Sequence, residues 1–314
     1  MSRSWNLRNG LPRFAVWCLL IASAGVTWAD DDTVSPDAVR DVLSRSVPLL
    51  QKSATTYVEK RDCFSCHHQA LPAVTVARAR RAGLAVDAES AGEQSDFTSE
   101  YFGGRAKRVR VGEGVPGAAY TAGYALWGLH ADGRKPDSVT NDLVAYLRTK
   151  HRHDGSWRIR THRPPLEDSD FTATALSLRG LQLYAGPEGA DDLAERIPRA
   201  RNWLLKARVK TNEDRVFRLI GLTWAASRKK DLKRLAKELI GLQRPDGGWA
   251  QLDGMQSDSY ATGQALFALK TSGVKVRRKS YQAGCRYLLK TVQPDGSWLV
   301  TTRSKAIQTY FETG

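Results

Sequence analysis

The stretch Pro245-Asp246-Gly247-Gly248-Trp249 carries the clearest fold information in the chain, because two close copies of it occur elsewhere. The copies are His153-Asp154-Gly155-Ser156-Trp157 and Pro294-Asp295-Gly296-Ser297-Trp298. Asp-Gly favours a tight turn, since Asp bonds its own downstream backbone and glycine accepts a positive φ, and the following Trp can fold back onto adjoining helix ends. We call these turns the first (153–157), second (245–249) and third (294–298) clasp. Their recurrence indicates a repeat protein.

A second recurring element begins a small, apolar segment near residues 65, 120, 170, 214 and 260. It is clearest at 120–126, 170–176 and 260–266, and fainter at 214–220 and 65–71. The starts are 44 to 55 residues apart, a spacing typical of stacked units that cannot each bury their own apolar face. The sequence therefore predicts five tandem units.

Amphipathic stretches lie between these starts, at 141–150, 197–209, 231–242 and 281–292. Their apolar residues recur at helical spacing opposite a Lys/Arg-rich face, whereas the segments that follow each start are apolar nearly all round. This difference predicts outer helices that face water and inner helices that face each other. Because no segment alternates apolar and polar residues over a strand's length, we expect an all-α fold.

The second clasp extends to a complete Gln-x-x-x-Gly-x-Trp pattern at 243–249, while His151 and Val292 replace the Gln of the other two clasps. With this pattern, residues 110–310 resemble the QW-repeat superfamily of squalene-hopene cyclases and protein prenyltransferase β subunits, also described as the prenyltransferase and squalene oxidase repeat. The resemblance implies the terpenoid cyclase fold, an α/α toroid of five to six helix pairs. It implies no particular reaction, because function depends on sites rather than folds.

Residues 1–29 are predicted to be a cleaved secretory signal peptide. Three arginines precede an apolar run at 14–24, and Thr27-Trp28-Ala29 precedes an acidic segment. An uncleaved N-terminal anchor is the alternative. Residues 30–314 are predicted to form one α/α-toroid repeat domain, and the protein is expected to be secreted or periplasmic.

The last helix pair of this toroid is incomplete in the sequence. After the start near 260, only one more outer helix and the third clasp follow, so the place of a sixth inner helix is empty. Three explanations are open: the sequence lacks its C-terminal end, the ring is open, or a partner closes it. We favour the first.

The chain has a net charge of +15, with basic clusters at 78–81, 105–110, 228–230 and 277–279. Such clusters can contact an anionic membrane surface or wall polymers, or they can form a solvated outer face. Nucleic-acid binding is not expected, because the chain is predicted to be exported and its basic residues are spread over several helices.

Cys63, Cys66 and His67 form a Cys-x-x-Cys-His pattern, which is typical of c-type haem attachment. The two thiols would form thioethers with the haem, and His67 would ligate its iron. The alternatives are a zinc site, and a structural use of the two cysteines as a local disulfide or as free thiols. The candidates for a sixth iron ligand are Met255, His130, His151, His153 and His162. The lone Cys285 is expected to be a small buried hydrophobe.

Asp168 and Asp170 are the candidate catalytic residues. The segment 167–173 resembles the Asp-x-Asp-Asp-Thr-Ala acid motif of squalene-hopene cyclases, in which the middle acid donates the proton; Phe171 replaces the third acid. The resemblance implies Asp170 as general acid, with Asp168 as the neighbour that raises its pKa. Helix capping is the competing interpretation. By repeat register, Cys66, His67 and Asp170 should border the same mouth of the toroid.

Three functions are consistent with these patterns. The first is an exported repeat protein that binds an apolar, polyprenyl-like ligand or a protein partner in a central cavity, with haem c at its mouth. The second is a terpene-cyclase-like isomerase that uses Asp170. The third is a haem c electron-transfer protein. Aromatic residues available for cation-π stabilisation or for plain core packing are Tyr120, Tyr124, Trp127, Phe171, Trp224, Tyr260 and Phe267.

Overall fold

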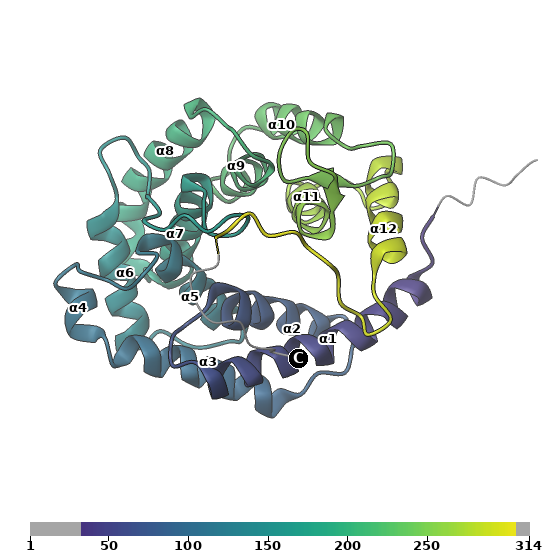
Figure 1. Cartoon of the computed structure of the whole chain (residues 1–314). Coiled ribbons are helices and arrows are strands. Elements are labelled where there is room, and N and C mark those ends of the chain that lie inside the picture. Colours follow the sequence, from purple (N-terminus) through teal and green to yellow (C-terminus); the bar gives the residue numbers. More distant parts are fainter. Residues whose placement is uncertain (1–32, 306–314) are drawn as a thin grey trace, which may run out of the picture. The chain divides into compact units, whose positions relative to one another are not determined.

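The computed structural model describes residues 33–305, so the predicted signal peptide lies outside the described residues. This part of the chain is helical (Figure 1). Its only sheet is one antiparallel pair of two-residue strands, β1 (Trp249–Ala250) and β2 (Ser257–Asp258). The predicted all-α class is confirmed.

A series of inner helices forms the core. They are η1 (Cys66–Ala70) with its continuation α2 (Leu71–Arg81), α5 (Ala119–Ala131), α7 (Asp170–Tyr184), α9 (Asn212–Trp224) and α11 (Ser259–Thr271). Each packs against the next in this order. Small residues permit the close approach: a Cβ added to Gly123 of α5 would lie 2.8 Å from the carbonyl carbon of Leu176 on α7. The predicted starts near 120, 170, 214 and 260 lie within two residues of the first residues of α5, α7, α9 and α11.

The outer helices lie at the periphery, outside the series of inner helices (Figure 1). They are α1 (Pro36–Lys60), α3 (Ala88–Gly103), α6 (Ser138–Lys150), α8 (Ala190–Lys206), α10 (Lys229–Gly241) and α12 (Lys279–Thr291), with short α4 (Ala106–Arg110) and η2 (Pro187–Gly189) between them. α10 buries only Leu235, Ala236 and Leu239, as an amphipathic surface helix should. The alternation of inner and outer helices is the predicted α/α arrangement. None of the helices between residues 33 and 305 combines the length and apolarity needed to cross a membrane.

The three clasps have the same geometry. Their central glycines all have a φ near +90°, the left-handed region that glycine tolerates best. Each clasp tryptophan donates a hydrogen bond from Nε1 to a carbonyl oxygen in the preceding outer helix: Trp157 to Leu147 (2.8 Å), Trp249 to Leu239 (2.8 Å) and Trp298 to Leu288 (2.9 Å). Each turn is therefore anchored to the outer helix that comes before it.

Each clasp also docks on the outer helix that lies next to it. Gly155 lies against Arg199 of α8, and Gly247 lies against Ala283 of α12. The third clasp has no later helix in the described residues and docks on α1 instead: Ser46 Oγ donates to Gly296 O at 2.6 Å, and Arg45 donates to Pro294 O at 2.7 Å. Among the described residues, α1 thus contacts the other end of the outer series; the three explanations for the empty sixth position remain predictions.

Candidate functional site

Glu213 places a carboxyl group where three neighbouring inner helices meet. It lies in the first turn of α9 and is 4 % exposed. Thr172 of α7 donates to its Oε1 at 2.7 Å. On α11, Tyr260 OH and Gln264 Nε2 lie 2.9 and 2.6 Å from its Oε2. The carboxyl group is therefore both buried and held by hydroxyl and amide groups.

Burial raises the pKa of Glu213 to about 7. The hydrogen bonds from Thr172, Gln264 and Tyr260 act in the opposite direction, and the charge of Asp214 raises the pKa further. Desolvation outweighs the hydrogen bonds because the charged form loses its water. Near neutral pH, Glu213 can therefore both hold and release a proton, as a general acid must.

The sequence around Glu213 explains its position. Thr211 caps α9 in a capping box with Asp214. Asp214 also accepts a hydrogen bond from Ser169 Oγ at 2.6 Å and one from the backbone N–H of Lys210 at 2.7 Å. Successive side chains of a helix point about 100° apart. Because the contacts of Asp214 fix its direction, the side chain of Glu213 points toward α7 and α11.

A narrow pocket adjoins Glu213. Its empty volume of about 170 Å³ is divided into gaps too narrow for a water molecule. The C-terminal segment covers it, since Arg303 Nε donates to Gln251 Oε1 at 2.9 Å and Arg303 N donates to Pro164 O at 3.2 Å. The lining residues are Pro165, Asn212, Glu213, Gln251, Tyr260, Ala261, Gln264 and Arg303.

The candidate aromatic residues divide into two groups. Tyr120 and Tyr124 are fully buried, and Phe171 packs against Trp203 of α8, with ring centroids 4.8 Å apart. These three side chains fill the core. The other four candidates, Trp127, Trp224, Tyr260 and Phe267, are partly exposed. Trp127 faces both Trp224 and Phe267, with centroid distances of 5.8 and 6.0 Å, so α5, α9 and α11 share one aromatic cluster.

The two cysteines of the Cys-x-x-Cys-His pattern are free thiols rather than a disulfide. Cys66 is buried at the start of η1, and burial raises the pKa of its thiol, with a further contribution from the charge of Glu167. Cys63 is half-buried, and its Sγ lies 3.1 Å from Tyr57 OH. The surroundings of Cys66 therefore favour its protonated form.

His67 is exposed to solvent at its surface, although many protein atoms surround its imidazole ring. Burial, with the charge of Arg163, lowers its pKa to about 4. Its Nδ1 lies 3.2 Å from Ser65 Oγ, a contact that orients the ring and directs Nε2 to other partners. Neutral imidazole supported at Nδ1 is the usual state of a metal-ligating histidine.

The zinc alternative requires further ligands close to Cys63 and Cys66. Among residues 33–305, no three His, Cys, Asp or Glu side chains gather in a way that could hold a metal ion, whereas thioether attachment requires only two thiols and one axial imidazole from this segment. Three candidate sixth ligands have other contacts: His151 stacks on Trp157, His130 packs on Tyr184, and His162 pairs with Asp168.

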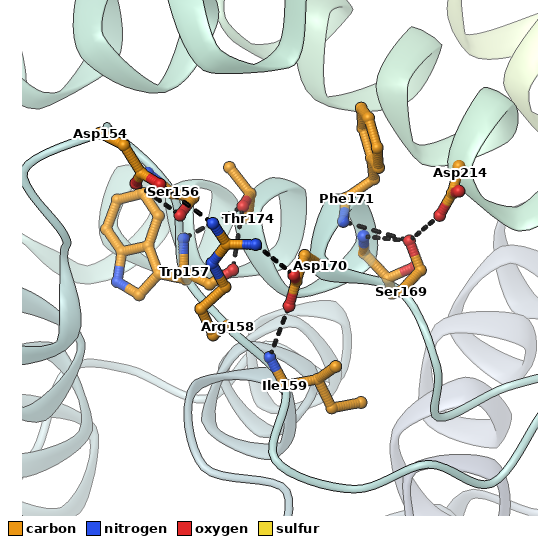
Figure 2. Close-up of polar contacts among 11 residues, drawn as sticks. Asp154, Ser156, Trp157, Arg158, Ile159, Ser169, Asp170, Phe171, Thr174 and Asp214 are labelled. Atoms are coloured by element: carbon orange, nitrogen blue, oxygen red, sulfur yellow. Dashed lines mark hydrogen bonds and ion pairs between the residues drawn. The ribbon is translucent and has the colours of Figure 1, made fainter. Parts of the chain in front are cut away.

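The predicted acids Asp168 and Asp170 make contacts within the loop that precedes α7, and Figure 2 shows those of Asp170. Asp170 accepts hydrogen bonds from Arg158 at 2.5 Å and from the backbone N–H of Ile159 at 3.0 Å. Asp168 pairs with His162 at 2.5 Å. Asp170 is the first residue of α7 and not its cap, because Ser169 Oγ accepts the hydrogen bonds of the first backbone N–H groups. The same loop brings Arg163 and Glu167, rather than Asp170, into electrostatic contact with His67 and Cys66.

The sequence pattern aligned Asp214 with Asp170 and did not single out Glu213, whose carboxyl group is the more deeply buried of the two neighbours. The adjacent acids Glu213 and Asp214, at the start of an otherwise apolar inner helix, were the available signal. Capping requires one of them, which leaves the other for a different role. Nothing in the local sequence indicates that Tyr260 and Gln264 would meet Glu213, because the three residues are brought together by the packing of α9 against α11.

Comparisons with known proteins add little to this description. No family model matches the chain, and no curated protein matches it. A similar solved structure is a variant of the type II terpene cyclase MstE from Scytonema, in complex with geranylgeranyl dihydroxybenzoate as its substrate. The TM-score is 0.48 and the identity 14 %, over 82 % of each chain. At these values the likeness concerns the fold, which the helix contacts already define.

Proposed function

We propose that the inner helices bind an apolar, polyprenyl-like molecule and that Glu213 protonates it. The observation that carries this proposal is a carboxyl group that is 4 % exposed and is hydrogen-bonded by side chains from two neighbouring inner helices. Burial raises its pKa to about 7. The partly exposed aromatic rings of Trp127, Trp224 and Phe267 supply an apolar surface that suits a hydrocarbon. The guanidinium groups of Arg78 and Arg179 lie over the rings of Phe267 and Trp224, at 4.6 and 5.5 Å from their centroids. The activity is that of a terpene-cyclase-like isomerase.

The hydrogen bonds of Gln264 support a protonated Glu213. Its Nε2 lies 2.6 Å from Glu213 Oε2, whereas its Oε1 is buried and has no hydrogen-bond partner among the described residues. Amide N and O are assigned from the hydrogen-bond network, and 2.6 Å is short for an N–H donor but usual for an O–H donor. Exchanging the two amide atoms places Oε1 at 2.6 Å from Glu213 Oε2, where it accepts a hydrogen bond from the protonated carboxyl group.

The proposed step balances without a further reactant. Glu213 transfers its proton to one carbon of an alkene, whose π electron pair forms the new C–H bond, and the other carbon becomes a carbocation. Ring closure or a shift moves the positive charge along the hydrocarbon. Loss of a proton from a neighbouring carbon to the Glu213 carboxylate then restores an alkene and the acid, so the product is an isomer of the substrate.

The test is conversion of added polyprenes, followed by gas chromatography of extracted products. Wild-type protein and Asp170→Asn should give the same products, while Glu213→Gln should give none and still quench the fluorescence of Trp127 and Trp224 on ligand addition. Product formation by Glu213→Gln equal to that of the wild type would refute the proposal. Loss of products only in Asp170→Asn would favour the alternative acid, Asp170 with Asp168 as neighbour.

A covalent haem c is the second candidate function, with Cys63 and Cys66 as thioether positions and His67 as the iron ligand. The contact between Ser65 Oγ and His67 Nδ1 supports it, and a bound haem would supply electron-transfer chemistry. Coexpression with a cytochrome c maturation system should give a protein with a Soret band and haem staining after denaturing electrophoresis. Cys63→Ser with Cys66→Ser should lack both signals, and equal spectra for wild type and variant would exclude attachment.

Export remains part of this proposal. The features of residues 1–29 support it, and mass spectrometry of the mature protein from a bacterial host tests it. A mature N-terminus at Asp30 in the periplasmic fraction is the expected result, and an intact Met1 in the cytoplasm would contradict it.

A further inference from the structure

A groove with basic edges lies on the outer side of the protein, between α10, the loop after α11 and the start of α12. Its volume is about 770 Å³. It brings together two basic clusters that are far apart in the sequence, 228–230 and 277–279. Neither cluster belongs to the inner site, so the groove needs an explanation of its own.

Charge of one sign surrounds the groove. Six of its eleven lining residues are cationic and none is acidic: Lys229, Lys233, Lys275, Arg277, Arg278 and Lys279. All six are exposed. The nearby acid Asp231 pairs with Arg228 at 2.9 Å and does not line the groove. The cations thus produce a local positive potential that attracts anions.

The backbone adds to this potential. The 13-residue helices α10 and α12 both begin at the groove, with Arg228 and Arg278 as N-cap residues that make no side-chain capping hydrogen bond. At α7 and α9, by contrast, the side chains of Ser169 and Thr211 accept those N–H groups. Helix N-termini carry a partial positive charge, which here adds to the charge of the six cationic side chains.

The floor of the groove is apolar. Leu232, Ala236 and Val274 form it, and Val276 on the same loop is 44 % exposed. A free inorganic anion would have no use for this apolar surface, whereas an acyl chain below an anionic headgroup would cover it. The combination of apolar floor and cationic edges is complementary to an anionic lipid.

We propose that this groove binds an anionic phospholipid of a membrane surface. The phosphate lies between the cations and the starts of α10 and α12, and the first carbons of an acyl chain lie on Leu232, Ala236 and Val274. This site is independent of the proposed chemistry at Glu213.

Sedimentation with lipid vesicles tests the proposal. The mature protein should bind vesicles of phosphatidylcholine and phosphatidylglycerol in equal parts and not vesicles of phosphatidylcholine alone. A groove variant with Lys229→Gln, Lys233→Gln and Lys275→Gln should bind about 100-fold more weakly, since each lysine near an anionic surface contributes about 1 kcal/mol. The matched control carries the same charge change at exposed positions on α1, α4 and α8: Lys52→Gln, Lys107→Gln and Lys206→Gln.

Specific binding predicts that the control variant retains wild-type affinity. Equal weakening in both triple variants would show a diffuse charge effect and overturn the proposal, as would the absence of binding to phosphatidylglycerol vesicles. Val274→Ser tests the apolar contact: weaker vesicle binding supports it, whereas unchanged binding together with full competition by inorganic phosphate would show a phosphate site and refute the lipid assignment. Circular dichroism confirms that each variant is folded.

Discussion

The starts of α7 and α9 differ although both carry acids in the first turn of an inner helix. At α7, Asp170 is 29 % exposed in its side chain and pairs with Arg158, while Ser169 caps the helix. At α9, Asp214 belongs to the capping box, and Glu213 is buried with three uncharged partners. A cation beside a carboxyl group favours its ionised form, whereas burial without a cation favours the protonated form. Partners, rather than position in the helix, therefore distinguish a structural acid from a candidate catalytic one.

The largest expected effect at these helix starts concerns Glu213 and pH. Its pKa is raised from 4.5 to about 7 in the folded protein, so the folded state binds more protons between these values and loses stability as pH rises through 7. Glu213→Gln removes this loss. Relative to wild type, the variant should gain up to about 3 kcal/mol of unfolding free energy on going from below pH 4.5 to well above pH 7.

Urea denaturation of both proteins over that pH range measures the difference directly. Other titrating groups, including His67, contribute to both proteins and cancel in the comparison. Parallel curves of stability against pH would mean that Glu213 titrates as an ordinary exposed glutamate.

The next largest effect on stability is expected for the residues that cap α7 and α9, Ser169 and Thr211. Ser169→Ala removes the acceptor for the N–H groups of Phe171 and Thr172 and the donor to Asp214. The expected loss of stability is about 2 kcal/mol, against about 1 kcal/mol for Thr211→Ala, which removes one cap acceptor. Chemical denaturation at constant pH gives both values. A larger loss of stability for Thr211→Ala would show that the hydrogen bond from Ser169 to Asp214 contributes little.

The smallest effect is expected for Asp170→Asn. Asparagine retains an acceptor for the N–H of Ile159 but loses the ion pair with Arg158, whose side chain is 42 % exposed. Partly exposed ion pairs contribute little, so stability should fall by less than about 1 kcal/mol. Thermal unfolding of Asp170→Asn and of Arg158→Gln measures the stability lost when either partner of this ion pair is removed. A loss of several times that size would show a structural role that the contacts of Asp170 do not account for.

The three clasps share the same turn and tryptophan hydrogen bond, but the burial of their tryptophan rings differs. Trp157 and Trp249 are almost fully buried, and their backbone N–H groups donate to Thr174 and Thr262 on the inner helix that follows. Trp298 makes the same Nε1 bond to its own outer helix but is only partly buried. The turn and its anchor are thus local, whereas burial of the ring needs a following inner helix.

Much of the fold was predictable because its signals are local. Asp-Gly turns, helical spacing of apolar residues and the uniformly apolar inner segments each act within one element. The contact between α1 and the third clasp was not predictable in this way, because Ser46 and Gly296 are 250 residues apart. Neither α1 nor the third clasp contains a sequence pattern that specifies its partner.

The candidate site divides along the same line. Residue type and spacing were sufficient to single out Cys63, Cys66 and His67, since the proposed haem attachment would depend on three positions close together in the chain. The protonation state of Glu213 depends on side chains from α7 and α11 and on the water that their packing excludes. Sequence patterns thus establish which groups are available, while the pKa of a buried acid follows only from the surroundings that folding assembles, because desolvation is a property of the packed environment and not of the residue.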